Sequence, residues 1–453
     1  MIPLTFKEAA RAVGSDSPLE GFFEGVSTDT RKITPGCLFI ALKGERFDGN
    51  EFAVKAVESG ALCAVVDRDC GLGDRQIIVK DTGRALLNLA GYYRSLFDIK
   101  VVGVTGSVGK TTTKEMIHTV LSAKYDTLKN EGNLNNEIGV PLTLFNLEKH
   151  HEAAVIEMGM SGFGEISRMT KTVKPDIAVI SNIGVSHIEK LGSREGILKA
   201  KLEILEGLAE DSPVILNGDD DMLIKADTGI HPVTYYGIQN TTCAYKALDI
   251  TSTDVETEFV CSFKGGTVKE CLPFTGRHNI YNALAAVACG KALGIDEAES
   301  LAALKNYRTT GMRQRINRRN GIVFIEDCYN ASPDSQAAAM SVLGNMNARR
   351  KIAVTGDMLE LGDYSETAHR LVGKYAAENR IDILLTYGEQ SRLTAESAAE
   401  NGLKTVKSFD DKDELKNYLS TLLKKGDAVL FKASRGMKLE DVIYGIYETL
   451  DNQ

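Results

Sequence analysis

The feature that most constrains this chain of 453 residues is a glycine loop between an apolar run and an amphipathic stretch, Gly103-Val-Thr-Gly-Ser-Val-Gly-Lys-Thr-Thr112. This order predicts a strand, a loop and a helix, in which backbone N–H groups and the positive helix end surround a phosphate. In such a loop Lys110 reaches the terminal phosphates of a nucleotide and the Thr111 hydroxyl binds Mg²⁺. The glycine spacing is a variant of G-x-x-x-x-G-K-T, and a glycine turn that merely precedes a lysine is the alternative.

Charge and cysteine usage narrow the class of partner. The net charge is −9, and the 53 basic residues form no block of like charge, which argues against nucleic acid as a main partner. The eight cysteines include no C-x-x-C pair, and no long apolar segment follows the N-terminus, so we expect a cytoplasmic protein with free thiols. The apolar runs are far shorter than the roughly 20 residues that cross a bilayer, so no membrane span is expected.

Alternating apolar and amphipathic stretches predict an α/β protein of three domains. We expect a small α/β domain over 1–97, a central P-loop domain with a parallel sheet over 98–312, and a Rossmann-like domain over 313–453. Helices should cover both faces of the central sheet, and ligands should bind at the carboxyl ends of its strands. The stretches 258–263 and 267–272 flank two glycines and predict a hairpin in the central domain.

Two polar side chains are expected at the same edge of that sheet as the glycine loop. Glu157 ends the apolar strand predicted at 153–158, where a carboxylate can bind Mg²⁺, although it could simply be solvated. His187 comes just after the strand predicted at 177–183. A lone histidine is more often a surface or core residue, so its position beside the loop is what makes it a candidate.

Lys201 is unusual because it falls on the apolar face of the helix predicted at 195–208. Ile197 lies four residues before it, whereas Glu203 falls on the opposite, solvated face. A lysine held among apolar side chains has its charged form disfavoured and becomes a nucleophilic amine. The alternative is a long stem that carries its amine out to solvent.

Four further polar segments could bind substrate. Ser27-Thr-Asp-Thr-Arg31 could hold a diphosphate or sugar, and Asn130–Pro141 could bind amides and hydroxyls, although both could be plain turns. Asp327-Cys-Tyr-Asn330 follows a predicted strand and is suited to ribose and base contacts. Phe431–Gly436 is a strand that runs into a small polar turn with two cations.

Together these motifs resemble those of the Mur ligases, the ATP-dependent amide-forming enzymes of peptidoglycan synthesis, over nearly the whole chain. Thr105–Thr112 is similar to their variant P-loop, Glu157 to their magnesium-binding glutamate, and Asn182–His187 to their Asn-Ile-x-x-x-His segment with its metal-linked histidine. Lys201, fourteen residues beyond His187, stands where the family carries a carbamylated lysine. The resemblance implies a carbamate that helps to hold a second Mg²⁺.

Within the family, the segments Gly132–Leu142, Asp327–Pro333 and Gly356–Gly362 are most similar to the members that join D-Ala-D-Ala to UDP-N-acetylmuramoyl-tripeptide. The resemblance implies these two substrates, ATP and two Mg²⁺ as cofactors, an acyl-phosphate intermediate and a monomer. It implies catalytic roles for Lys110, Lys201, His187 and Glu157, and metal ligation by Thr111, Glu157, His187 and Lys201. The implied nucleotide-binding residues are Gly106, Ser107, Val108, Gly109, Lys110, Thr111, Thr112, Asn279, Arg313, Asp327, Tyr329 and Asn330. The implied substrate-binding residues are Ser27, Asp29 and Arg31 for the UDP-sugar, Lys432, Ser434 and Arg435 for the dipeptide, and Asn133, Asn135 and Asn136.

Other functions are compatible with parts of this pattern. Within the superfamily the rivals are a ligase that adds the third peptide residue and a folylpolyglutamate synthetase. A nucleotide-dependent switch would need only the P-loop, but the chain has no Asn-Lys-x-Asp motif for reading guanine, and two further α/β units would lack a role.

Overall fold

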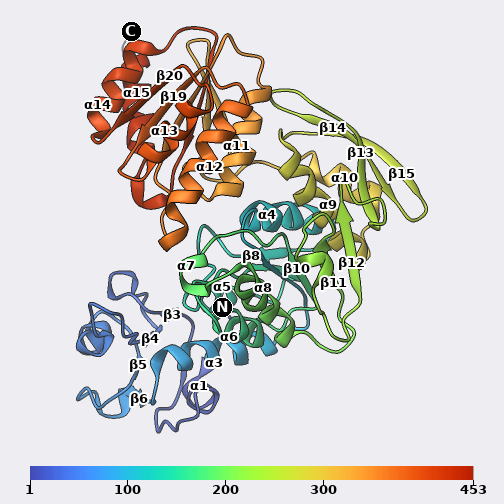
Figure 1. Ribbon diagram of the computed structural model, residues 1–453. Coiled ribbons are helices and arrows are strands. Elements are labelled where there is room, and N and C mark those ends of the chain that lie inside the picture. Colours follow the sequence, from blue (N-terminus) through green and yellow to red (C-terminus); the bar gives the residue numbers. More distant parts are fainter. Residues whose placement is uncertain (452–453) are drawn as a thin grey trace.

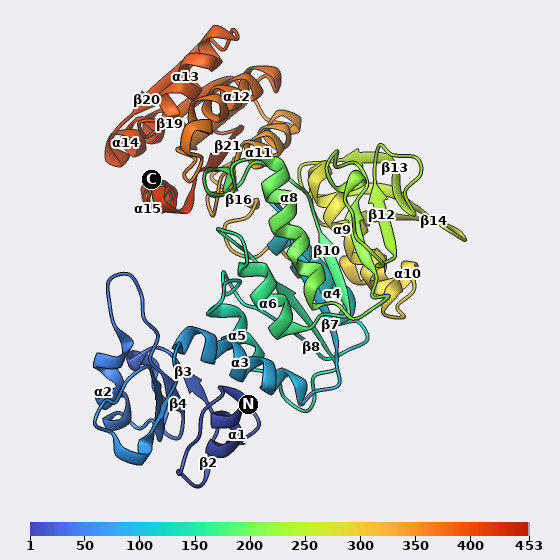
Figure 2. The ribbon, with the colours of Figure 1, turned by 60° about the horizontal axis from the view of Figure 1, so that its bottom comes forward.

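The computed structural model describes residues 1–451, which form three units that follow one another along the chain (Figure 1). Figure 2 shows the N-terminal unit in blue, the central unit in teal to yellow and the C-terminal unit in orange to red, each in its own part of the ribbon. Each unit contains a sheet with helices packed on it. Within residues 1–451 no helix combines the length and apolar character that a membrane span requires.

The central unit is built on a nine-stranded sheet with the order β15-β14-β13-β12-β11-β10-β7-β9-β8. Its strands are β7 (Lys100–Thr105), β8 (Thr127–Lys129), β9 (Ala153–Glu157), β10 (Ile177–Ile180), β11 (Val214–Asn217), β12 (Val233–Gly237), β13 (Tyr245–Ser252), β14 (Thr257–Phe263) and β15 (Gly266–Leu272). All neighbouring strands from β8 to β13 pair in parallel, whereas β14 and β15 are antiparallel. The predicted parallel sheet and the predicted hairpin of the central unit are both confirmed, and the hairpin lies at one end of the sheet.

Helices cover both faces of this sheet, as predicted. Successive strand residues point to opposite faces, so Val102 and Val104 of β7 belong to one buried cluster and Val101 to another. One face carries α4 (Lys110–Leu121), α9 (Arg277–Ala292) and α10 (Glu297–Leu304). The other carries α3 (Thr82–Ser95), α5 (Gly139–Leu144), α6 (Glu165–Val173) and α8 (Arg194–Leu202).

The helix predicted at 195–208 is shorter in the structure. It is α8, which ends at Leu202 and passes into a 3₁₀ turn over Glu203–Gly207. The sequence pattern predicted Glu203 as a solvated charge, but the structure shows its carboxylate in hydrogen bonds with the backbone. Its carboxylate accepts hydrogen bonds from the N–H groups of Gly164, at 2.7 Å, and Ser167, at 3.1 Å, and so satisfies the free donors at the start of α6.

The N-terminal unit contains a parallel sheet and a short antiparallel pair. Its strands and helices are β1 (Leu4–Thr5), α1 (Phe6–Ala12), β2 (Phe22–Phe23), β3 (Val26–Ser27), β4 (Leu38–Ile40), α2 (Ala53–Glu58), β5 (Cys63–Val66) and β6 (Gln76–Ile78). Strands β3 to β6 form the parallel sheet in sequence order. The buried residues of α2 cover one face of it, whereas the other face packs on α1 and α3.

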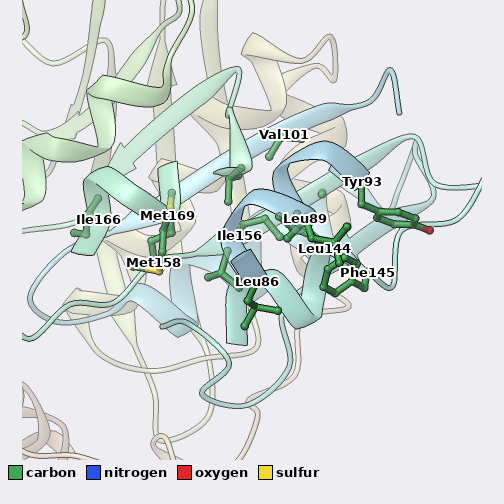
Figure 3. Packing of buried hydrophobic residues seen from close by; sticks show 14 of the residues in the cluster. Leu86, Leu89, Tyr93, Val101, Leu144, Phe145, Ile156, Met158, Ile166 and Met169 are labelled. Carbon is green, nitrogen blue, oxygen red and sulfur yellow. The ribbon is translucent and has the colours of Figure 1, made fainter. Parts of the chain in front are cut away.

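Helix α3 joins the N-terminal unit to the central one through a single buried cluster (Figure 3). Leu86 and Leu89 lie near Leu144 and Phe145, at the end of α5. The fully buried Tyr93 hydroxyl accepts from the N–H of Ile2 and donates to the carbonyl of Leu147, both at 2.7 Å. The two units therefore share one hydrophobic core.

The C-terminal unit is a doubly wound sheet with the order β16-β17-β21-β18-β19-β20. Its strands are β16 (Arg315–Arg319), β17 (Ile322–Glu326), β18 (Arg350–Gly356), β19 (Ile383–Tyr387), β20 (Thr405–Phe409) and β21 (Asp427–Lys432), of which only β16 is antiparallel within this described sheet. One face carries α11 (Pro333–Asn345), α12 (Ser365–Glu378) and α13 (Ser391–Glu400). The other carries α14 (Lys412–Leu422) and α15 (Glu440–Asp451), so the Rossmann-like prediction is confirmed.

Candidate active site

A cavity of about 670 Å³ lies between the central and C-terminal units, where strands β7, β9, β10 and β11 end. It brings together most of the residues that the sequence singled out: Ser107, Val108, Gly109, Lys110, Thr111, Thr112, Asn133, Asn135, Asn136, Glu157, His187, Asn279, Arg313, Asp327, Tyr329, Asn330 and Lys432. The remaining candidates do not line it: Ser27, Asp29, Arg31, Gly106, Lys201, Ser434 and Arg435. This placement agrees with the rule that open α/β sheets bind ligands at the carboxyl ends of their strands.

The loop between β7 and α4 has the backbone that a phosphate cradle needs. Gly106 has a φ of +148°, and a Cβ there would lie 2.0 Å from Ser181 Oγ. Gly109 has a φ of +82° at the start of α4. Lys110 Nζ donates to the carbonyls of Gly106, at 2.8 Å, and Ser107, at 3.1 Å, so its amine lies back over the loop. Burial lowers the pKa of Lys110, and the positive charge of Arg313 lowers it further.

The neighbouring strand fixes the shape of the loop. Asn182, just beyond β10, accepts from the N–H of Val108 at 2.8 Å and donates to its carbonyl at 3.1 Å. Ser181 Oγ donates to the same carbonyl at 2.7 Å. Ser107 lines the cavity, and its Oγ is buried without a hydrogen-bond partner among the described residues. A buried hydroxyl of this kind is ready to bind a polar ligand.

Glu157, at the end of β9, is held from both sides. Thr111 Oγ1 donates to its Oε2 at 2.8 Å, and Asn135 Nδ2 donates to its Oε1 at 2.7 Å. Asn130 bonds the backbone N–H and carbonyl of Glu157, at 2.9 and 3.0 Å. The buried Lys114 donates to the Asn130 carbonyl at 2.5 Å. Sequence reasoning missed Lys114, although its place four residues after Lys110 puts it on a neighbouring part of the α4 surface.

His187 precedes the short helix α7 (Ile188–Leu191) and meets the C-terminal unit. Its Nδ1 lies 2.8 Å from Glu360 Oε2. Burial, with Lys110 close by, lowers the pKa of His187 to about 4, so the imidazole is neutral at pH 7. Because a carboxylate only accepts, Nδ1 carries the proton and Nε2 keeps the lone pair. A lone pair is what a metal ion requires of an imidazole.

Lys201 lies in α8 with 1% of its surface exposed, as its position on the apolar face predicts. Burial moves its pKa well below the usual range, and the nearby positive charge of Lys110 adds to the effect. A positive charge on Lys201 would also lower the pKa of His187. A neutral amine at this position can act as a nucleophile. Its role as a metal ligand stays a prediction.

The C-terminal side of the cavity is a polar and aromatic surface. The guanidinium of Arg313 lies 4.1 Å from the centre of the Tyr329 ring, a cation–π arrangement. The buried Lys432 donates to Asp327 Oδ2 at 2.8 Å and to the carbonyl of Asn330 at 3.1 Å. These contacts fix the segment that follows β17, with the Tyr329 ring beside the cavity.

Two of the predicted dipeptide contacts are held by residues outside the cavity lining. Ser434 Oγ accepts from the N–H of Leu359 at 3.0 Å. Arg435 forms an ion pair with Glu440 at 2.7 Å. Neither residue lines the cavity, although Lys432 of the same segment does.

The predicted UDP-sugar residues form a separate polar turn in the N-terminal unit. Arg31 donates to the Asp29 carboxylate at 2.8 to 3.2 Å, which lowers the pKa of Asp29 to about 2. Ser27 Oγ donates to the Asp29 carbonyl at 3.0 Å. The turn is therefore preformed, with the guanidinium largely exposed.

The donors of the cavity fit a magnesium–nucleotide complex. Thr111 and Glu157 offer the oxygen ligands that Mg²⁺ prefers, and His187 offers a nitrogen lone pair. The glycine loop leaves no room for a Cβ at Gly106, and the Ser107 hydroxyl lacks a partner within residues 1–451. Both features suit a cradle that is completed by phosphate oxygens.

Comparisons with known proteins agree along almost the whole chain. Residues 23–88 match the Mur ligase family catalytic domain, residues 104–290 the Mur ligase middle domain, and residues 312–435 the Mur ligase glutamate ligase domain. The chain is 42% identical to the UDP-N-acetylmuramoyl-tripeptide–D-alanyl-D-alanine ligase of Bacillus subtilis strain 168, over 94% of this chain and 93% of that protein.

Solved structures are similar in fold as well as in sequence. A crystal structure of MurF from Acinetobacter baumannii has a TM-score of 0.92 and 34% identity, covering 98% of this chain and 99% of that one. The structure of MurF ligase from Thermotoga maritima in complex with ADP has a TM-score of 0.86 and 29% identity, and the match covers 95% of this chain and 98% of that one.

Proposed function

Because the chain belongs to the Mur ligase family, we propose that it joins D-alanyl-D-alanine to UDP-N-acetylmuramoyl-tripeptide in the synthesis of peptidoglycan precursors. The chain is an ATP-dependent ligase that forms an amide bond. The observation that carries the proposal is the cavity at which the P-loop and Glu157 face Arg313, Asp327 and Tyr329 of the C-terminal unit.

The reaction has two steps. A carboxylate oxygen of the tripeptide forms a bond to the γ-phosphorus of ATP, while the bond from that phosphorus to the ADP oxygen breaks. The amine of D-alanyl-D-alanine then attacks the carbonyl carbon of the acyl phosphate, phosphate leaves with the bonding electron pair, and the nitrogen loses a proton. Water must be excluded between the two steps, which suits a site closed between two units.

The P-loop residues bind and orient the nucleotide. Lys110 is free to exchange its two bonds to loop carbonyls for bonds to phosphate oxygens. Bound Mg²⁺, held by Thr111, Glu157 and His187, would offset negative charge on the transferring phosphoryl group. Asn279, Arg313, Tyr329 and Asn330 would contact the ribose and base. These side chains line the same cavity as the P-loop.

For the other two substrates we propose binding residues in each of the three units. Ser27, Asp29 and Arg31 would bind the UDP-sugar, supported by the preformed turn of the N-terminal domain at 1–97. Asn133, Asn135 and Asn136 would meet the peptide in the cavity of the central domain at 98–312. Lys432, Ser434 and Arg435 of the domain at 313–453 would bind the dipeptide side. We propose that the enzyme acts as a monomer.

We also propose that Lys201 reacts with CO₂ to give a carbamate that helps to hold a second Mg²⁺. The amine nitrogen bonds to the carbon of CO₂ while one C–O π bond opens to give the carboxylate, and the nitrogen releases one proton. The lowered pKa of Lys201 supports this step because it disfavours the protonated amine. Lys201→Ala should reduce phosphate release at least about 100-fold, the scale on which single electrostatic groups act in active sites. Added acetate or formate should restore part of it. Normal activity in Lys201→Ala would show that the amine has only a packing role.

The substrate assignment is tested by phosphate release and product mass. UDP-muramyl-tripeptide with D-alanyl-D-alanine should release phosphate and give a product heavier by the dipeptide minus water. UDP-muramyl-dipeptide with a diamino acid should neither release phosphate nor give a heavier product. Turnover of the second pair in preference to the first would reassign the enzyme to the addition of the third residue. Hydrolysis unaffected by either pair would indicate a nucleotide switch.

A further inference from the structure

The segment Gly184–His187 of the central unit is contacted by two carboxylates of the C-terminal unit. Glu360 Oε2 lies 2.8 Å from His187 Nδ1. Asp334 Oδ2 lies so near Gly184 that a Cβ on this glycine would be 2.1 Å from it. His187, Asp334 and Glu360 line the cavity. The segment that carries the candidate metal-binding histidine is therefore seated against the other unit.

We propose that Glu360 is a positioning residue for His187: it accepts a hydrogen bond from the Nδ1–H group across the interface and so presents Nε2 to the metal only when the two units meet. The inference rests on the metal-binding role proposed for His187. It adds that the metal site is completed by a side chain from a different unit, and thus that metal affinity and closure of the two units are coupled.

The hydrogen bond determines the tautomer of the imidazole. A neutral histidine carries one proton, and a carboxylate at Nδ1 holds the proton there. Metal-binding histidines commonly donate the other ring N–H to a carboxylate, which fixes the ring and raises its basicity. In His187 this partner comes from the loop between β18 and α12, at Glu360. Without it, the Nε2–H tautomer becomes available, and this tautomer cannot bind a metal through Nε2.

The backbone on both sides of the contact adopts the left-handed region. His187 has a φ of +65° and Glu360 a φ of +63°, a region that residues other than glycine rarely occupy. Gly362 has a φ of +50°, and a Cβ there would lie 2.9 Å from Glu189 Cγ. Backbone in this region persists where the surrounding structure holds it and is typical of functional sites. Here both strained residues bring their side chains to the same contact.

The contact between Glu360 and His187 is not explained by a contribution to the stability of the interface. The Glu360 side chain is 65% exposed, and exposed carboxylate pairs contribute little to stability because water screens them. The histidine is 23% exposed and lines the cavity, so its orientation is what the contact can control.

The first test measures Mn²⁺ binding to the full-length protein by the EPR signal of the free ion. Glu360→Ala should weaken Mn²⁺ binding about 10- to 100-fold, the range for loss of a carboxylate that supports a metal ligand. Glu360→Gln keeps an acceptor and should recover part of the affinity. Glu366→Ala is the matched control, because Glu366 is an exposed glutamate of the same unit that pairs with Arg370. It should bind Mn²⁺ as the wild type does.

The second test reads the tautomer directly by ¹⁵N NMR of labelled histidine, with the His187 signals assigned from their loss in His187→Ala. Wild type should show Nδ1 protonated and Nε2 unprotonated, and Glu360→Ala should show a mixture of both forms. Unchanged Mn²⁺ affinity and an unchanged tautomer in Glu360→Ala, with affinity lost in His187→Ala, would overturn the inference alone. Wild-type Mn²⁺ affinity in His187→Ala would overturn it together with the role proposed for His187.

Discussion

The Lys110 amine is hydrogen-bonded to its own loop in the structure. The amine forms hydrogen bonds with two carbonyls of that loop, which neutralise none of its charge. Burial and the charge of Arg313 disfavour that charge and the Glu157 carboxylate favours it, with a net lowering of the pKa of Lys110. An anion in the cavity would therefore interact favourably with the amine.

Lys110→Ala should lower the rate of phosphate release about 100- to 1000-fold, as loss of one preorganised electrostatic group does in other active sites. Phosphate release with saturating substrates is the measurement. Lys149→Ala is the control, since Lys149 is exposed, lies outside the cavity and should be neutral to activity. A normal rate of phosphate release in Lys110→Ala would contradict the role proposed for the P-loop in the reaction.

Lys201 should make stability depend on pH. Burial in the folded protein disfavours the charged form of Lys201 and lowers its pKa, whereas the unfolded chain protonates it below a pKa of about 10.4. Between the lowered pKa and 10.4 the unfolded chain binds more protons, so this residue's contribution to the free energy of unfolding rises with pH. Lys201→Met should therefore stabilise the protein more at pH 7 than at pH 10.

Urea unfolding in CO₂-free buffer at the two pH values measures this difference. Lys199→Met is the control, because Lys199 is exposed on the same helix. Equal stabilisation by Lys201→Met at both pH values would mean that the amine is charged in the folded protein.

Among single residues, those on a regular pattern could be predicted from the sequence. The burial of Lys201 follows from helical periodicity, and Glu157 follows from an apolar strand that ends in an acid. The pairing of His187 with Glu360 could not be predicted, because these residues are far apart in sequence and no periodicity relates them. Lys114 was missed because a buried lysine has the same sequence signal as a solvated one unless its helix face is known.

At the scale of elements, the β7–loop–α4 unit depends on the absence of a side chain at Gly106. The residue lies against Ser181, whose hydroxyl donates to the Val108 carbonyl and so helps to fix the loop. A side chain at this position would meet Ser181 and would also strain the backbone at a φ of +148°.

Gly106→Ala should reduce the free energy of unfolding by about 1–3 kcal/mol, the cost of one residue in a sparsely populated backbone region. It should also weaken ADP binding. Urea unfolding and calorimetric ADP titration are the measurements. Gly266→Ala is the control, since nothing lies within 4 Å of a Cβ there and its φ is not positive. Equal ADP affinity in the two variants would contradict the cradle geometry.

Element types were predictable because apolar periodicity differs between strands and helices. The ends of elements were harder to predict, as α8 shows. The apolar pattern continues past Leu202, but Glu203 turns to cap α6, and the chain leaves the α-helical path there. Contacts between elements, which single-sequence patterns do not report, decide such ends.

At the scale of the whole molecule, the first two units differ from the third in how they are joined. The buried cluster around α3 includes Leu38 and Val65 of the N-terminal sheet as well as Ile156 of the central sheet. The C-terminal unit has its own buried clusters and meets the central unit across a cavity lined by polar side chains. Relative motion is therefore expected at the second junction, where the reaction requires closure.

Tyr93→Phe tests the shared core. It removes a buried hydroxyl and leaves the Ile2 N–H and the Leu147 carbonyl without this partner, which should cost about 1–3 kcal/mol. Hydrogen exchange should show β4 and β7 losing protection together. Tyr92→Phe is the control, since its hydroxyl pairs with the solvent-accessible Glu8. Loss of protection in β4 alone would show that the N-terminal unit unfolds separately.

The shared core also affects how the chain folds during synthesis. Helix α3 leaves the ribosome before α5 and α6, against which it packs, and α6 ends at Val173. At about 5–20 residues per second, the interval from residue 98 to Val173 lasts roughly 4–15 s. During that time the part of α3 that packs on α5 and α6 has no partner on the nascent chain, although α1 and the N-terminal sheet are already made. The core that the first two units share therefore cannot be completed until the central unit is translated as far as α6.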